Sequence, residues 1–476
     1  MDVFRQAVTP PEVLFVHAPY PGRLKFRAVP SSMFAAAGPF VVANRDRQAT
    51  YLDPGSPTPE FYAHLESLLA TGRVRALCIS TSTAAIEETA RIAATSSLLA
   101  PETLVIVGGP HENDIDNKSA NRLPGVHLSI GGEASSALRN LLELYLSDNR
   151  TAEEFVRGLH PRNLTEADTC GTFTVASSCW PAGVEFDQGP SRFRDPRPLL
   201  IPENYPRFDV FSSPATIPLM VSRGCSYGRC TFCAEANRDG SVIRTSDYEW
   251  IARLADRAPE AALYFQDSIF PAGNDSSSEL LPLLRNLGRE WGCQVYLPTL
   301  TERRIAELAD HGCTYLYTGI ESGAPDVLEG IRKPKVQPRL VAERTRWIAK
   351  KGPRVGLSLM FGSMSTNGVV LENERSLNLT RDLTDAVRDT GVRIAGFYPN
   401  VQTVLPGTQL ARGIAAAGQD LDFYTMPRAP IFDGLEDGGV GYNFLTVATP
   451  SANELSLAES IVATAKDIQH LGVCSW

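Results

Sequence analysis

The chain has 476 residues and a formal net charge of −9, with 43% hydrophobic and 21% charged residues. This length predicts two or three globular domains, and the acidic balance argues against a nucleic-acid-binding surface. No secretory signal follows Met1, and there is no apolar run of the roughly 18 residues that a transmembrane helix needs, so we expect no membrane association. Nine cysteines, an odd number and mostly scattered, predict a reducing, cytoplasmic location rather than a disulfide framework.

The N-terminal part of the chain alternates short apolar runs with helical patterns. The expected strands lie at 13–16, 76–80, 104–107 and 126–130, and the expected helices at 84–98 and 134–146. Strands that alternate with helices predict an α/β fold, here a doubly wound parallel sheet of Rossmann or flavodoxin type over residues 1–148. Ligands of such sheets bind beyond the carboxyl ends of the strands, at the topological switch point.

Small, glycine and hydroxyl-bearing residues follow three of these expected strands. Glycines let a large flat ligand approach the backbone closely. A nucleotide-binding or purely structural sheet is the alternative, but no phosphate-loop pattern supports a nucleotide. We expect His17 and His111 to be turn histidines rather than metal ligands. The candidate cofactor-binding residues are Ser80, Thr81, Ser82, Gly108, Gly109, Pro110, His111, Gly131, Gly132 and Glu133.

A second run of strand–helix units begins after a segment with little periodicity. Residues 149–213 are rich in Pro, Arg, Asn and Asp, and we interpret them as a linker, with Cys170 and Cys179 as lone thiols rather than ligands of a second cluster. From residue 214 the apolar runs restart, and six units predict an open, partial (β/α)6 TIM-like barrel over 214–410. Its strands are expected near 217–222, 262–266, 294–297, 315–319, 355–362 and 393–398.

Three cysteines follow the first expected strand of this barrel. Cys225, Cys230 and Cys233 lie in the run Ser-Arg-Gly-Cys-Ser-Tyr-Gly-Arg-Cys-Thr-Phe-Cys. Three thiolates this close can hold one soft metal centre, and they leave one iron of a four-iron cluster open to a small molecule. A zinc loop or buried free thiols are the alternatives. Zinc requires a fourth ligand, and no Cys or His lies between Cys179 and Cys225 or between Cys233 and Cys293.

The cysteine run resembles the cluster loop of the radical S-adenosylmethionine enzymes, whose usual spacing is Cys-x3-Cys-x2-Cys. The first interval here is one residue longer, and Gly228 within it offers the backbone freedom to absorb the insertion. The flanking Arg-Gly-Cys and Cys-Thr-Phe-Cys, with Phe232, are typical of the cobalamin-binding branch. The loops at 108–111 and 131–133 resemble recurrent loops of that branch's cobalamin domain. The Asp-x-His-x-x-Gly motif of other cobalamin domains is absent, which implies cobalt without a histidine ligand.

Other strand ends of the expected barrel resemble further segments of the same branch. By this resemblance, Gln266 and Asp267 lie near the methionine end of S-adenosylmethionine, and Glu321 and Ser322 lie near its ribose or carboxylate. The alternative for each is a strand-end side chain that bonds its own loop. The family's Gly-x-Pro-Gly-Glu-Thr is missing after Ser363, which leaves the contacts of that loop open.

The resemblance implies a cobalamin-dependent C-methyltransferase that carries a 4Fe–4S cluster and acts on an unactivated carbon of a small metabolite or natural-product intermediate. It would work through a 5′-deoxyadenosyl radical and methylcobalamin, with an external electron donor such as flavodoxin or ferredoxin. The alternatives are a rearrangement, ring contraction or cyclisation with the same cofactors, and a non-catalytic sensor. Residues 411–476 are expected to cap the substrate cavity, with Tyr424 or Tyr442 closing it, and Cys474 to lie at a functionless end.

Overall fold

The computed structural model describes most of the chain, in two compact units. Unit 1 comprises Met1–Pro21, Phe26–Asn204 and Asp422–Met426, and unit 2 comprises Gly22–Lys25, Tyr205–Leu421 and Pro427–Trp476. Glu133, Cys170, Cys179 and Cys474 lie outside the described residues, so the predictions for them stay predictions. The described residues are 10–20, 37, 40–41, 43–44, 47–115, 118–132, 135–159, 172–177, 180–187, 208–235, 243–245, 248–270, 276–433, 435 and 439–471.

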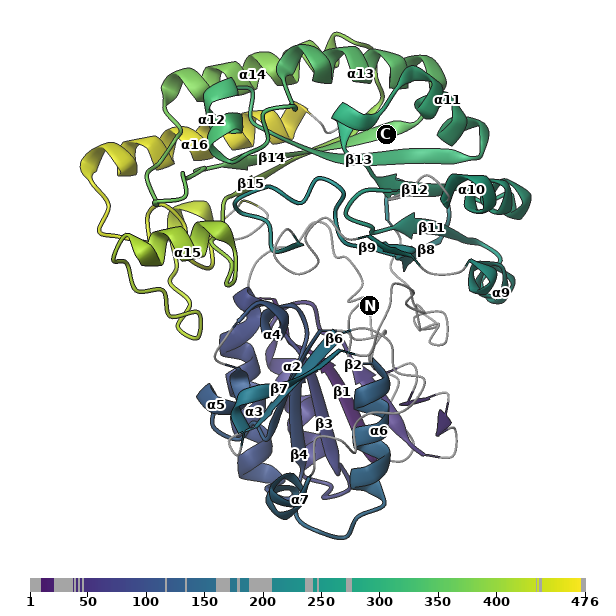
Figure 1. Ribbon diagram of the computed structural model, residues 1–476, viewed down its shortest axis with the longest axis vertical. Helices are drawn as coiled ribbons and strands as arrows, with labels where there is room; N and C mark the ends of the chain where they lie inside the picture. Colours follow the sequence, from purple (N-terminus) through teal and green to yellow (C-terminus); the bar gives the residue numbers. More distant parts are fainter. Residues whose placement is uncertain are drawn as a thin grey trace. The chain divides into compact units, whose positions relative to one another are not determined.

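Unit 1 is built on one twisted sheet with the strand order β2-β1-β3-β4-β5-β6-β7 (Figure 1). The strands from β2 to β5 run parallel, which confirms the predicted doubly wound sheet. The order 2-1-3-4-5 is that of flavodoxin-like folds and places the switch point between β1 and β3. The parallel strands are β1 (Val13–His17), β2 (Ala49–Leu52), β3 (Ala76–Ser80), β4 (Leu104–Gly108) and β5 (Leu128–Gly132).

An antiparallel hairpin extends this sheet. β6 (Thr172–Ser177) pairs antiparallel with β5, and β7 (Trp180–Asp187) pairs antiparallel with β6. Helix α7 (Ala152–Gly158) precedes the hairpin and begins with a capping box at Thr151 and Glu154. The range 149–213 is therefore not a plain linker as expected, because its first half adds a helix and two strands to unit 1.

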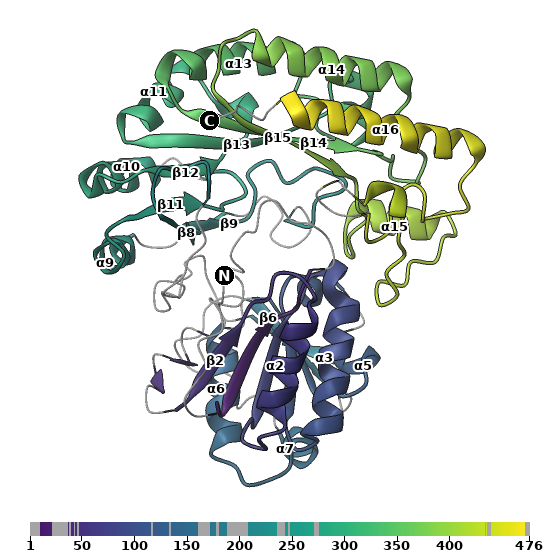
Figure 2. The ribbon, with the colours of Figure 1, turned by 180° about the vertical axis from the view of Figure 1, so that it is seen from behind.

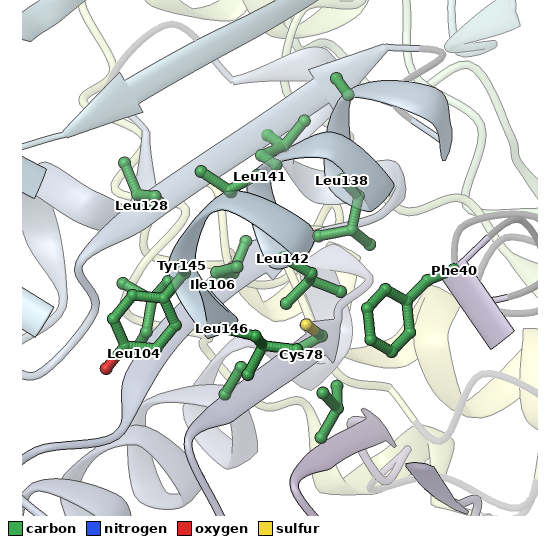
Figure 3. Packing of buried hydrophobic residues seen from close by; sticks show 14 of the residues in the cluster. Phe40, Cys78, Leu104, Ile106, Leu128, Leu138, Leu141, Leu142, Tyr145 and Leu146 are labelled. Atoms are coloured by element: carbon green, nitrogen blue, oxygen red, sulfur yellow. The ribbon is translucent and has the colours of Figure 1, made fainter. Parts of the chain in front are cut away.

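Helices cover both faces of the sheet in unit 1. Figure 2 shows α2 (Pro59–Leu69) and α3 (Ile86–Leu99) on one face, and α6 (Ser135–Leu146) lies on the other. Leu138, Leu141, Leu142 and Tyr145 recur at helical spacing along α6 and pack onto alternate residues of the strands (Figure 3). Two short helices, α4 (Pro110–Asp114) and α5 (Ser119–Arg122), follow β4.

Unit 2 is a partial barrel, as predicted. Its six-stranded sheet has the order β15-β14-β13-β12-β11-β8, so the strands follow chain order, and every neighbouring pair is parallel. The strands are β8 (Ala215–Leu219), β11 (Ala261–Phe265), β12 (Trp291–Gln294), β13 (Cys313–Glu321), β14 (Arg354–Phe361) and β15 (Ile394–Val401). Two strands of two residues each, β9 (Ser222–Arg223) and β10 (Arg244–Thr245), pair with each other in a separate sheet.

The third strand of the barrel begins and ends earlier than expected. β12 ends at Gln294, and the range Leu297–Thr299 forms a 3₁₀ turn instead. Pro298, which has no N–H to donate to a central strand, lies within this turn. Gly292 within β12 weakens the strand pattern of the sequence, yet it is required: a Cβ there would lie 2.9 Å from the Cβ of Tyr315 on β13.

Helices line the barrel sheet in unit 2 (Figure 1). No helix among the described residues is long and apolar enough to cross a membrane. The helices of unit 2 are α9 (Glu249–Arg257), α10 (Ser276–Leu287), α11 (Glu302–Asp310), α12 (Pro325–Gly330), α13 (Pro338–Lys351), α14 (Glu374–Arg388), α15 (Gln409–Ala416) and α16 (Ala452–Leu471).

Candidate cluster and cofactor sites

The loop that carries the three cysteines begins directly after β9, beyond the carboxyl end of β8. Gly224 (φ 93°) and Gly228 (φ 53°) both have left-handed backbone conformations, which glycine adopts without steric cost. The N–H of Gly228 donates to Cys225 Sγ at 3.4 Å, while the absorption of the extra residue at Gly228 stays a prediction. All three cysteines are partly exposed, and none is in a disulfide with another described cysteine.

Contacts with distant segments hold this loop in place. Tyr227 Oη donates to the carbonyl of Arg332 at 2.6 Å, and the N–H of Thr231 donates to the carbonyl of Ile331 at 3.3 Å. The carbonyl of Thr231 accepts from the N–H of Leu410 at 3.0 Å. The loop after β8 is thus bonded to the segment after β13 and to the start of α15, and sequence reasoning predicted neither contact.

The donor set of the cysteine loop, three thiolates, suits a 4Fe–4S cluster that keeps one iron open. Among the described residues, no group of three or more His, Cys, Asp or Glu side chains is placed to hold one metal ion. In a 4Fe–4S cluster each thiolate binds a different iron, so its ligands need not converge as the ligands of one zinc ion do. Burial raises the pKa of Cys230 to about 12, and metal binding would displace that proton.

Asp267 anchors the first residues of the cysteine segment. Its fully buried carboxylate accepts from the backbone N–H of Val221 at 3.2 Å and from both the N–H and the hydroxyl of Ser222. The expected contact of Asp267 with S-adenosylmethionine stays a prediction, and the structure shows the alternative role, a strand-end carboxylate that holds a loop. Gln266, its neighbour, is only partly buried and donates its N–H to the carbonyl of Leu219 at 2.7 Å.

Glu321 ends β13 in an unusual backbone conformation. Its φ of 59° is positive, which is rare for a residue other than glycine and is a strain that clusters at functional sites. Its buried carboxylate pairs with the ammonium of Lys333 at 2.6 Å. Ser322 is fully buried, and its hydroxyl accepts from the N–H of Ala324 at 3.1 Å, a local structural bond. Phe232, between the second and third cysteines, is partly exposed.

In unit 1, the candidate cofactor loops pack tightly against one another. The N–H of Thr81 donates to the carbonyl of Gly108 at 2.8 Å, and the N–H of His111 donates to the carbonyl of Thr81 at 3.2 Å. Gly109 has a φ of 104°, and a Cβ there would lie 2.7 Å from the carbonyl oxygen of Thr81. A Cβ at Gly131 would lie 2.6 Å from the carbonyl oxygen of Glu112. These two glycines are therefore required by loop packing, a reason that the sequence pattern did not reveal.

His17 and His111, near the carboxyl ends of β1 and β4, both contact other protein groups. His111 is fully buried, its Nδ1 lies 3.2 Å from Thr83 Oγ1, and burial lowers its pKa to about 3. Its Nε2 has no hydrogen-bond partner among the described residues. His17 Nδ1 lies 3.7 Å from a carboxylate oxygen of Asp53. That cobalt takes no histidine ligand stays a prediction.

Two further features escaped the sequence reasoning. Tyr424, one of the two expected capping tyrosines, lies in the short segment that belongs to unit 1, whereas Tyr442 lies in unit 2. Glu372 is buried and accepts from the N–H of Gly362 just after β14, where the family's loop motif is missing. In the sequence, Glu372 is only an acidic residue some positions after Gly362, the glycine that follows the expected strand.

Comparison with known proteins supports this two-unit architecture. No family model matches the chain. An uncharacterized methyltransferase of Pyrococcus horikoshii, PH0819, is 22% identical over 274 residues, which cover 54% of this chain. The chain spans about half the length of this curated relative, 53%.

Two solved structures share most of the fold. The radical S-adenosylmethionine methyltransferase TsrM from Kitasatospora setae, with cobalamin and a [4Fe-4S] cluster bound, aligns with a TM-score of 0.58 at 14% identity over 85% of this chain and 77% of that one. The cobalamin-dependent S-adenosylmethionine radical enzyme OxsB aligns with a TM-score of 0.57 at 14% identity over 91% of this chain and 64% of that one. The chain therefore has the fold of cobalamin-dependent radical S-adenosylmethionine enzymes, a flavodoxin-like sheet unit joined to a partial barrel.

Proposed function

We propose that this protein is a cobalamin-dependent radical S-adenosylmethionine C-methyltransferase that acts on an unactivated carbon of a small metabolite or natural-product intermediate. The observation that carries the proposal is the three-cysteine loop at the carboxyl end of β8, at the first strand of the partial barrel. The fold shared with TsrM and OxsB, and the methyltransferase description of PH0819, support the same reaction class.

The residues of unit 2 would hold the cluster and S-adenosylmethionine. Cys225, Cys230 and Cys233 supply three thiolates, which leaves one iron for the amine and carboxylate of S-adenosylmethionine. Asp267 fixes the first residues of the cysteine segment through Ser222. When bound, the cluster and cobalamin supply the electron that opens S-adenosylmethionine and the methyl group that is transferred. The remaining candidates around S-adenosylmethionine are Phe232, Gln266, Glu321 and Ser322.

The residues of unit 1 would hold cobalamin. The loops after β3, β4 and β5 lie at the carboxyl edge of a parallel sheet, where flavodoxin-like folds bind their ligands. We assign cobalamin binding to the parallel sheet within residues 1–148, to which α7, β6 and β7 are added, and cluster binding to the barrel within 214–410. Residues 411–476 we assign to a substrate-capping region, apart from Asp422–Met426, which belong to unit 1. The proposal also requires a one-electron donor such as flavodoxin or ferredoxin, and we place the enzyme in the cytoplasm, where thiols stay reduced.

Iron content tests the cluster assignment. Anaerobically reconstituted full-length protein is expected to hold about four irons per chain and a brown chromophore. Changing Cys225, Cys230 and Cys233 together to Ala should abolish both. Cys78→Ala is the matched control, because burial in the sheet raises the pKa of the Cys78 thiol, and the side chain serves packing rather than metal binding. Iron that persists in the triple variant would refute the assignment.

Product mass tests the reaction. The reconstituted protein, with S-adenosylmethionine, methylcobalamin and a reductant, is incubated with candidate small molecules. Tryptophan is one of them, because a TsrM structure holds it as substrate. A product heavier by one methylene supports methyl transfer. A product of altered structure without added mass would instead indicate a rearrangement, and cofactor binding with no S-adenosylmethionine cleavage under any condition would indicate a sensor.

A further inference from the structure

The segment after α12 is bonded to the cysteine loop on both sides of Cys230. Tyr227 Oη, three residues before this cysteine, donates to the carbonyl of Arg332, and the N–H of Thr231, one residue after it, donates to the carbonyl of Ile331. Arg332 has a positive φ of 57°, and the N–H of Lys333 turns back to the carbonyl of Leu328 at 2.7 Å. These bonds hold Ile331 and Arg332, the two residues before Lys333, against the loop around the middle cysteine.

The ammonium of Lys333 is enclosed by the protein. The residue is 8% exposed, and its Nζ donates to Glu321 Oε1 at 2.6 Å and to the carbonyl of Gly319 at 3.0 Å. A Cβ at Gly319 would lie 3.0 Å from this Nζ, so the glycine makes room for the ammonium. The ring of Tyr296, which stacks on Tyr227 with centroids 5.1 Å apart, lies 5.8 Å from Nζ.

Stability alone is a weak reason for such a pair. Desolvation of two buried charges cancels most of their attraction, and apolar residues of similar size often stabilise a protein as well or better. The pair nevertheless lies beside the cysteine loop, because the ring of Tyr296 is a neighbour both of the Lys333 ammonium and of Tyr227 in that loop. The Lys333–Glu321 pair is therefore better explained by a role at the neighbouring cysteine loop than by stability.

We propose that the Lys333–Glu321 pair sets the reduction potential of the cluster held by Cys225, Cys230 and Cys233, an inference that rests on the proposed function. Reduction adds one electron from an external one-electron donor to the cluster and breaks no bond. A buried cation beside the thiolates stabilises the added negative charge, because Coulomb interactions are strong where water is excluded. Lys333 therefore makes the cluster easier to reduce, and the carboxylate of Glu321 partly offsets this effect.

Removing the positive charge of the pair and removing its negative charge should shift the midpoint potential of the cluster in opposite directions. The experiment is a redox titration of reconstituted full-length protein with a chemical reductant, without S-adenosylmethionine, followed by the paramagnetic signal of the reduced cluster. Lys333→Gln should move the midpoint potential to a more negative value, and Glu321→Gln to a more positive one. Lys333→Arg keeps the charge and should stay near wild type. Lys335 lies two residues from Lys333 and is exposed, so water and salt screen its charge. Lys335→Gln should therefore leave the midpoint potential unchanged.

The outcomes separate this inference from the proposed function. Wild-type protein that holds no cluster refutes the proposed function itself. Iron-replete Lys333→Gln and Glu321→Gln proteins with unchanged potentials, or with shifts of the same sign, overturn the role of the pair alone. Where Lys333→Gln fails to fold, because Glu321 is left buried without its cation, the positive shift expected for Glu321→Gln decides the matter by itself.

Discussion

The ring of Tyr424 packs edge-on against the imidazole of His111, with ring centroids 5.2 Å apart and planes at 85°. His111 follows β4, in a loop that we expect to bind cobalamin, while Tyr424 comes from the C-terminal part of the chain. The guanidinium of Arg122 lies 4.9 Å from the Tyr424 ring and pairs with the carboxylate of Asp422 at 2.9 Å. Unit 1 is thus completed by a short segment, Asp422–Met426, that is remote in sequence.

Removing the Tyr424 ring should loosen this segment and the loop beneath it. Tyr424→Ala deletes an aromatic contact worth about 0.5–1.5 kcal/mol and the cation–π contact with Arg122. Hydrogen exchange should speed up at residues 110–115 and 422–426. Tyr424→Phe keeps the ring and loses only a hydroxyl 3.5 Å from Ser119 Oγ, so it should exchange like wild type. Equal exchange in the Ala variant would show that the ring does not hold the segment.

Gly109→Ala should damage the cofactor loop of unit 1. The new Cβ would lie 2.7 Å from the carbonyl oxygen of Thr81, in addition to the strain of a positive φ. Gly72→Ala is the matched control, because Gly72 also has a positive φ of 67° but nothing lies within 4 Å of its Cβ position. We expect the control to lose about 1–2 kcal/mol from the left-handed backbone alone. Gly109→Ala should lose more and bind cobalamin more weakly.

Thermal unfolding and spectroscopic titration with cobalamin measure both effects in unit 1. Equal losses of stability in the two glycine variants, with unchanged cobalamin affinity in Gly109→Ala, would contradict the close packing of the loops after β3 and β4.

Asp267→Ala should release the first residues of the cysteine segment. The substitution leaves the buried N–H groups of Val221 and Ser222 without their acceptor, and each unsatisfied group costs about 1–3 kcal/mol. We expect a lower unfolding temperature and incomplete iron loading after reconstitution. Asp256→Ala, an exposed position on α9, serves as the control and should retain both properties. Full iron loading and wild-type stability in Asp267→Ala would argue that the carboxylate does not anchor the loop.

Glu372 should make the stability of the protein fall as the pH rises from about 4.5 to about 8. Burial raises the pKa of its carboxyl from 4.5 to about 8, although the N–H groups of Gly362 and Ser363 oppose the shift. The folded state therefore binds a proton that the unfolded state releases. This contribution to stability is fully present below about pH 4.5 and is lost as the pH rises through about 8.

The unfolding temperature, measured between about pH 4.5 and pH 8, checks this sign. Glu372→Gln removes the titrating group and should flatten the decline. Glu374→Gln, an exposed neighbour on α14, should leave the decline unchanged. A decline that persists in Glu372→Gln would mean that another group causes it.

Local patterns in the sequence predicted most of the architecture. Strands β1, β3, β4 and β5 of unit 1 and five of the six barrel strands were confirmed near their expected positions, because buried parallel strands are short apolar runs bounded by turn residues. The parallel edge strand β2 (Ala49–Leu52) was not predicted. The hairpin of β6 and β7 was missed because two short antiparallel strands lie within a range dominated by polar residues and prolines. The third barrel strand was misplaced because Gly292 weakens its pattern and Leu297 strengthens a neighbouring one.

The sequence by itself determined the cysteine loop, since three thiols within nine residues are brought together by chain connectivity alone. Only the tertiary structure decided which groups surround that loop. The carbonyl of Arg332 accepts from the hydroxyl of Tyr227, 105 residues away in sequence, and this bond holds the segment before Lys333 against the cysteine loop. The carboxyl ends of parallel strands meet at one edge of the sheet, so residues from distant loops become neighbours there. No local pattern encodes such pairings, because they depend on strand order and on backbone hydrogen bonds between loops.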